Sequence, residues 1–310
     1  MSAGRRSPRG AGGIVDRARA TLLGVAVGDA LGATAEFMTP AEIRGRYGVL
    51  REIVGGGWLK LAPGQVTDDT DMTLCVARGI VRSGQWELGP IADRFARWLS
   101  GNPADVGTTC RRGIEEYMKK GRLEAPPDER GAGNGAAMRV APVALYALGD
   151  EELLSRLAVA QARITHHHPL SDAACVAVGT MIQRGLLGGP LPGLRAAAEE
   201  LTARHPEFRF GKYDGRSSAY VVDTLRTVFD AFFSTDGFEE CVVKTVNRGG
   251  DADTTGSIAG AIAGARYGLA AIPQRWLQSL DPGLREELSA LAEKLVRLSP
   301  RFVGNAGKAS

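Results

Sequence analysis

Apolar residues recur along this chain at spacings of three and four positions, and alternation with a period of two is scarce. Such spacing places the apolar side chains on one face of an α-helix. The pattern predicts helices near residues 15–35, 70–83, 90–100, 108–120, 137–148, 152–163, 171–187, 193–204, 218–233, 238–247, 254–269 and 283–297. The Gly- and Pro-rich breaks between them are too short to be interdomain linkers. We therefore expect an all-α fold, with a single compact helical domain over residues 14–300.

Glycines spaced four apart mark two of the predicted helices. They are Gly24, Gly28 and Gly32 in the first helix, and Gly256, Gly260, Gly264 and Gly268 in a later one. Each interior Gly costs about 1 kcal/mol relative to Ala, so the close approach of another backbone is the expected compensation. A membrane dimerisation motif has similar spacing, but Asp29, Glu36 and Arg266 interrupt it. We expect the two helices to be buried and closely packed, which would bring Glu36 toward residues 251–254.

Charge and composition exclude several classes of protein. The 38 Lys and Arg residues nearly balance the 35 Asp and Glu residues, and they are too scattered for a nucleic-acid-binding surface. No run of eighteen apolar residues is present, so no transmembrane segment is expected. Residues 1–13 are basic and polar, lack the apolar core of a signal peptide, and are predicted to form a disordered tail. Four widely spaced cysteines without a zinc pattern indicate reduced thiols in a cytoplasmic protein: Cys75, Cys110, Cys175 and Cys241.

Two short acidic stretches, residues 66–71 (VTDDTD) and 249–255 (GGDADTT), place carboxylates beside hydroxyls with almost no positive charge nearby. Asp and Thr at a helix start often serve only as caps, and a helix N-terminus favours negative charge. Capping needs one side chain, however, and here five carboxylates are present: Asp68, Asp69, Asp71, Asp251 and Asp253. Brought together, they would repel one another unless a cation lay between them. Oxygen-only ligands suit Mg²⁺ or Mn²⁺ rather than zinc or copper, so the stretches predict a carboxylate-bridged metal site.

A glycine-flanked turn and a run of histidines are further candidate sites. Gly133, Asn134 and Gly135 precede a predicted helix, where backbone amides can bind an anion, although the same pattern also marks ordinary turns. The three histidines at 166–168 are consecutive, so their side chains point in different directions and seldom converge on one ion.

Five segments of the chain, in this order, resemble the motifs of the ADP-ribosylglycohydrolase family. They are residues 24–37 (GVAVGDALGATAEF), 66–71 (VTDDTD), 133–142 (GNGAAMRVAP), 164–169 (ITHHHP) and 246–256 (VNRGGDADTTG). Residues 55–61 (GGGWLKL) and 105–107 (DVG) are most similar to the branch of the family formed by the dinitrogenase reductase-activating glycohydrolases.

The resemblance implies an all-α fold with a dinuclear metal centre, of two Mn²⁺ or Mg²⁺ ions, at the base of a cleft. By motif position, the implied metal ligands are Thr67, Asp68, Asp69, Asp251, Asp253 and Thr254. Glu36 matches the glutamate of the first motif, which implies that it orients a water at the metals or a ribose hydroxyl; the alternative is an ordinary solvated helix residue.

The resemblance also assigns catalytic and substrate-binding residues. Asp105 is the implied catalytic carboxylate beside the ribose, and Glu129 the implied contact to the arginine at the entrance; each could instead be a surface loop charge. Gly133, Asn134 and Gly135 would contact ribose and phosphate, and His166 would line the cleft. Tyr220 is a candidate for stacking on adenine, although packing between helices is the commoner role of a Tyr.

The function implied is a metal-dependent hydrolase that removes ADP-ribose from arginine of a protein, with nitrogenase iron protein (dinitrogenase reductase) as the implied target. A hydrolase acting on serine or an ester, a non-catalytic ADP-ribose-binding member, and a magnesium-dependent phosphoesterase are the alternatives. The last does not explain the segments around Asn134 and His166. The resemblance also raises a PII-type signalling protein as partner, and regulated peripheral membrane association through a partner.

Overall fold

Helices account for the regular secondary structure of residues 11–302, which are the residues that this computed structural model describes. The β-type pairings in this range are two isolated bridges, from Gly56 to Leu61 and from Gly133 to Tyr220. The α-helices are α1 (Ala11–Gly32), α2 (Pro40–Tyr47), α3 (Asp68–Ser83), α4 (Leu88–Ser100), α5 (Thr108–Lys120), α6 (Ala141–Tyr146), α7 (Glu151–Arg163), α8 (Pro169–Leu186), α9 (Leu191–Arg204), α10 (Val221–Phe233), α11 (Phe238–Val246), α12 (Ala252–Tyr267), α13 (Gln274–Ser279) and α14 (Pro282–Leu298). Two short 3-10 helices, η1 (Pro206–Phe208) and η2 (Leu269–Ala271), complete the set. The predicted all-α fold is confirmed.

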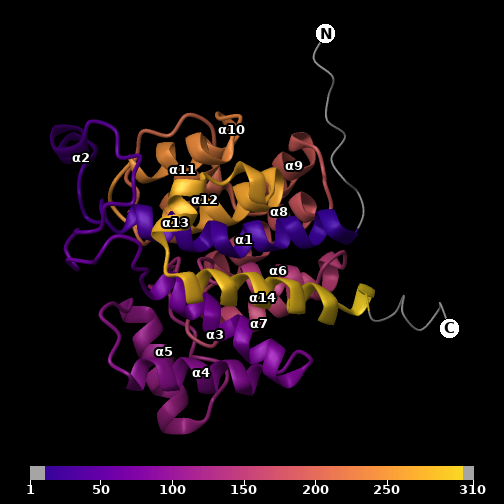
Figure 1. The fold of residues 1–310 in the computed structure, drawn as a ribbon. Coiled ribbons are helices and arrows are strands. Elements are labelled where there is room, and N and C mark those ends of the chain that lie inside the picture. The colour runs from indigo at the N-terminus through magenta and orange to yellow at the C-terminus, as the bar shows by residue number, and fades with distance from the viewer. Residues whose placement is uncertain (1–10, 303–310) are drawn as a thin grey trace.

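The glycine stripes bring α1 and α12 together at the centre of the molecule. In Figure 1, α1 crosses the middle, with α9 to α12 on one side and α3, α4, α5 and α14 on the other. A Cβ added to Gly28 would lie 2.1 Å from the carbonyl oxygen of Gly256, and one added to Gly260 would lie 2.0 Å from that of Gly24. Only glycine allows backbones to approach this closely, which confirms the predicted contact. The contact brings the C-terminal end of α1 beside the start of α12, and the site forms there.

Three local features depart from the sequence-based expectations. The helix expected near 137–148 is shorter: turns occupy residues 135–139, and α6 begins at Ala141. The helices α2 and α13 were not predicted, because α2 has one buried apolar residue, Ile43, and α13 has only six residues. Helix α1 begins at Ala11, inside the predicted tail of residues 1–13, whereas residues 1–10 lie outside the described range.

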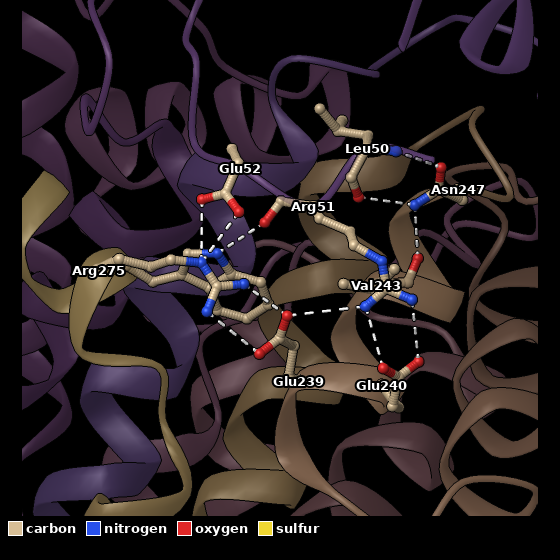
Figure 2. Close-up of polar contacts among 9 residues, drawn as sticks. Leu50, Arg51, Glu52, Glu239, Glu240, Val243, Asn247 and Arg275 are labelled. Carbon is tan, nitrogen blue, oxygen red and sulfur yellow. Dashed lines mark hydrogen bonds and ion pairs between the residues drawn. The ribbon is translucent and has the colours of Figure 1, made fainter. Parts of the chain in front are cut away.

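The segment between α2 and α3 is fastened at its base to α11 and α13 (Figure 2). The Asn247 side chain accepts from the Leu50 N–H and donates to the Leu50 carbonyl, both at 2.9 Å. The Trp276 indole donates to the Arg51 carbonyl at 2.8 Å. Exposed ion pairs extend this attachment: Arg51–Glu240, Arg275–Glu52 and Arg275–Glu239. The base of the segment is therefore held in place although it lacks helical structure.

The sequence predicts no transmembrane segment, and it predicts that the cysteines are reduced. Among residues 11–302, no helix is both long enough and apolar enough to cross a bilayer. All four cysteines are buried and free, as predicted.

Candidate active site

A cavity of about 630 Å³ opens at the junction of α1, α3 and α12. Ten of the residues selected from the sequence line it: Glu36, Asp68, Asp105, Gly133, Asn134, Gly135, His166, Asp251, Asp253 and Thr254. They come from six separate segments, so the cavity exists only in the folded chain.

Three carboxylates from two segments converge at this cavity. One oxygen each of Glu36, Asp251 and Asp253 lies within 4.8 Å of the other two. Short backbone hydrogen bonds set this geometry: the Phe37 N–H donates to the Gly250 carbonyl at 2.6 Å, and the Gly250 N–H donates to the Met38 carbonyl at 2.8 Å. The end of α1 is thereby tied to the turn before α12.

The two acidic stretches contact each other beside these three carboxylates. Thr254 Oγ1 donates to Asp69 Oδ2 at 3.0 Å, and Thr67 Oγ1 lies 3.5 Å from Asp253 Oδ2. Thr67 is also the N-cap of α3, so the capping interpretation holds for this one side chain. Asp69 Oδ1 is buried and has no hydrogen-bond partner among the described residues. This oxygen is therefore able to coordinate a cation.

Asp29 holds the start of the first acidic stretch by hydrogen bonds, and it was not among the predicted site residues. Its carboxylate accepts from the Thr67 N–H at 3.0 Å, from the Thr70 N–H at 3.1 Å and from the Thr70 hydroxyl at 2.5 Å. An acidic residue inside a buried, glycine-striped helix was the available signal, because such a charge needs several partners.

The carboxylates are crowded and lack cationic partners. Burial, opposed by a hydrogen bond from Trp58, raises the pKa of Glu36 to about 8. Burial and the nearby Asp105 carboxylate raise the pKa of Asp68 to about 8 as well. Burial also raises the pKa values of Asp69 and Asp253 well above the ordinary range. Within residues 11–302, no Lys or Arg forms an ion pair with any of them. The cluster is therefore unfavourable when ionised without a cation.

The loop at residues 133–135 lies against the acidic group. The Asn134 side chain donates to Asp251 Oδ2 at 2.6 Å and to Thr224 Oγ1 at 2.9 Å. A Cβ on Gly133 would lie 2.9 Å from His166 Nε2, so a larger residue there would displace the imidazole. Burial lowers the pKa of His166 to about 3, which leaves the imidazole neutral at physiological pH.

Comparison with known proteins identifies this arrangement. A family model described as ADP-ribosylglycohydrolase matches residues 12–302. The chain belongs to the ADP-ribosylglycohydrolase family. It is 50% identical over 284 residues to an ADP-ribosyl-(dinitrogen reductase) glycohydrolase from Rhodospirillum rubrum, which covers 92% of this chain and 97% of that protein. It is 32% identical over 308 residues to an ADP-ribosylarginine hydrolase from Serratia proteamaculans, which covers 92% of this chain and 80% of that relative.

A solved structure has the same fold as this family member. The structure of an ADP-ribosylglycohydrolase-related protein complex matches with a TM-score of 0.82 and 38% identity, over 92% of this chain and 99% of that chain. The fold and family predicted from the sequence are both confirmed.

The acidic groups of this ADP-ribosylglycohydrolase fit the divalent cations predicted from the sequence. The donors are oxygens only, which is the set that Mg²⁺ and Mn²⁺ prefer. The unpartnered Asp69 Oδ1 and the converging oxygens of Glu36, Asp251 and Asp253 provide the negative charge that a cation would balance. Glu36 was predicted to orient a water or a ribose hydroxyl. Its position beside Asp251 and Asp253 makes it a candidate cation ligand as well.

Not every residue selected for substrate binding reaches the cavity. Asp105 lines it, and burial together with Asp251 raises the pKa of its carboxyl. Glu129 is an exposed loop residue and is not among the lining residues. Tyr220 is 42% exposed and also does not line the cavity, although its backbone pairs with Gly133 beside it. His168 does not line the cavity either, and its side chain caps α8.

Several lining residues were not selected from the sequence, namely Phe37, Trp58, Cys110, Met138 and Ser217. Trp58 follows three glycines inside residues 55–61, the segment that resembles one branch of the family, and this was the available signal.

Proposed function

We propose that this ADP-ribosylglycohydrolase removes ADP-ribose from an arginine side chain of a protein, and that dinitrogenase reductase is its target. The Rhodospirillum rubrum relative is named for action on dinitrogen reductase, and the Serratia relative for action on ADP-ribosylarginine. The observation that carries the proposal is the convergence of Glu36, Asp251 and Asp253 beside the Asn134 loop in one cavity.

Two divalent cations, Mn²⁺ or Mg²⁺, are part of the proposal. The residues that would hold them are the ones selected from the sequence: Thr67, Asp68, Asp69, Asp251, Asp253 and Thr254, with Glu36 added by the geometry. When bound, such cations supply electrostatic stabilisation of charge that develops on substrate oxygens.

The residues of the chain have separate roles in this hydrolysis. Cleavage breaks the bond between the ribose carbon and a guanidine nitrogen; a hydroxyl from water joins the carbon, and a proton joins the nitrogen. Asp105 is the carboxyl placed to move that proton, because it lines the cavity and burial raises its pKa above the ordinary range, which favours its action as an acid. Asn134 holds Asp251 in place, and the loop at residues 133–135 offers amides to ribose and phosphate oxygens.

Release assays with two linkages test the proposal. Dinitrogenase reductase carrying arginine-linked ADP-ribose and a protein carrying serine-linked ADP-ribose are each incubated with Mn²⁺ or with EDTA, and free ADP-ribose is measured. We expect release from the arginine linkage with Mn²⁺ only. Release from the serine linkage alone would contradict the proposal that arginine is the acceptor. Undiminished release in EDTA would contradict the proposed cation requirement.

A matched pair of variants separates the acidic site from a general charge effect. Asp251→Asn removes one charge from the cavity and should lose release of ADP-ribose. Asp214→Asn makes the same change on a side chain that is 76% exposed in a surface loop, and it should keep release at the wild-type rate.

The PII-type partner, the cytoplasmic location and the membrane association stay predictions.

A further inference from the structure

Trp58 lies at the mouth of the cavity and donates its indole N–H to Glu36 Oε2. Among the described residues, this indole is the only hydrogen-bond donor to the Glu36 carboxylate. The neighbours of that carboxylate are otherwise like-charged, since Asp105, Asp251 and Asp68 all act on it. Without the indole, no hydrogen bond from the described residues would fix the orientation of this carboxylate, so its side chain could take other rotamers.

The turn that carries Trp58 is built to hold it there. The three glycines at 55–57 have left-handed φ angles of 68°, 85° and 66°, and the Gly56–Leu61 bridge closes the turn. A Cβ on Gly57 would lie 2.3 Å from the carbonyl oxygen of Ala33, so the turn rests directly on the end of α1. The base of the segment is fixed by Asn247 (Figure 2). The indole is therefore held at a defined place relative to Glu36.

Trp58 contributes little to the core. It is 48% exposed, and its ring partner, Phe37, is 66% exposed with ring centroids 5.4 Å apart. Packing would account for a buried tryptophan at this position. It does not account for a half-exposed tryptophan whose N–H is directed to a carboxylate in the cavity. We propose that Trp58 is a positioning residue, whose indole N–H holds the Glu36 carboxylate against Asp251 and Asp253 for the hydrolysis proposed above.

The inference rests on the proposed function, in which Glu36 takes part in hydrolysis. One oxygen of Glu36 accepts the indole N–H, so the other has no protein donor and remains for the cavity. Trp58 thereby determines which way the carboxylate faces. The substrate need not touch the indole for this, so the effect belongs in kcat rather than in KM.

The test compares Trp58→Phe with Trp98→Phe. Both replacements remove an indole N–H that is bonded to a carboxylate. The partner of Trp98 is Asp71, at 3.0 Å, and neither Trp98 nor Asp71 lines the cavity. We expect Trp58→Phe to lower kcat roughly 10- to 100-fold, as expected for loss of a hydrogen bond to a charged group. KM and the calorimetric affinity for ADP-ribose should change less than about twofold, because the contacts proposed for ribose and phosphate remain. Trp98→Phe should keep the wild-type kcat.

A double-mutant cycle and a crystal structure complete the test. In a Glu36→Ala background, Trp58→Phe should cause no further loss of kcat, because the indole acts only through Glu36. Crystals of the Trp58→Phe protein should show the Glu36 carboxylate turned away from Asp251 and Asp253. An unchanged kcat, an additive loss in the cycle, or an unmoved carboxylate would each overturn the inference. The last result is decisive even if the wild-type protein releases no ADP-ribose, an outcome that would overturn only the proposed function.

Discussion

Replacing Gly28 by Ala should both destabilise the protein and weaken its site. The new Cβ would lie 2.1 Å from the carbonyl oxygen of Gly256, whereas ordinary contact begins at 3.4 Å, so the two backbones must separate by about 1.3 Å. Overpacking of a core costs about 1–3 kcal/mol and occasionally more, and the better helix propensity of Ala returns about 1 kcal/mol. The obstacle is a backbone atom that cannot rotate aside, so the overpacking cost lies at the upper end of its range or above, and we expect a net loss of about 2 kcal/mol or more.

The matched control is Gly45→Ala in α2. An added Cβ there meets nothing within 4 Å, so the substitution should stabilise by about 0.4–1 kcal/mol. Urea denaturation of the three proteins measures both changes. The same separation would pull Glu36 from Asp251 and Asp253, so release of ADP-ribose by Gly28→Ala should fall under conditions where it is still folded. A Gly28→Ala protein as stable as the wild type, or an equal loss in Gly45→Ala, would refute the packing argument.

Three further outcomes are expected. Asp251→Ala should abolish hydrolysis while helical circular dichroism persists; retained activity would contradict the metal proposal. The melting temperature of the metal-free protein should rise as pH falls from 9 to 6. The pKa values of Glu36 and Asp68 are raised to about 8, above their unfolded values near 4, so the folded state binds more protons than the unfolded state. Mn²⁺ should flatten this pH dependence, and a melting temperature of the metal-free protein that instead rises with pH would contradict the prediction. Asn247→Ala should cost about 1–3 kcal/mol in urea denaturation by leaving backbone groups unpaired, whereas Arg275→Gln, which breaks exposed ion pairs, should cost less than about 1 kcal/mol; the reverse order would show that the ion pairs anchor the segment.

The features that could be predicted from the sequence are those with a periodic or local signal. Apolar spacing located most of the helices, and the glycines of α1 and α12 predicted which two would touch. That contact in turn predicted that Glu36 would approach residues 251–254, as it does. Each step follows from helix geometry, in which positions four apart share a face.

The features that escaped prediction depend on irregular backbone. The Trp58–Glu36 hydrogen bond requires a three-glycine turn, and no periodicity indicates where its tip will point. The placement of Glu129 and Tyr220 also depends on loops, and motif order alone could not tell that both side chains would lie outside the cavity lining. Asp29 was overlooked because a single acidic residue in a helix was interpreted only as an argument against a membrane segment.

The carboxylates of the site oppose the packing that assembles them. Close contact of α1 and α12 forces Glu36 toward Asp251 and Asp253, and no Lys or Arg among the described residues forms an ion pair with this group. In the metal-free protein, protons must relieve the repulsion, which is why burial and neighbouring charge raise these pKa values. A cation at the same place would relieve it without protonation, and at one hundred times its Kd would stabilise the fold by about 2.7 kcal/mol. Glycine packing therefore links folding to the proposed chemistry, because the helix contact that makes the metal-free site unfavourable is also the one that would create a place for the proposed ion.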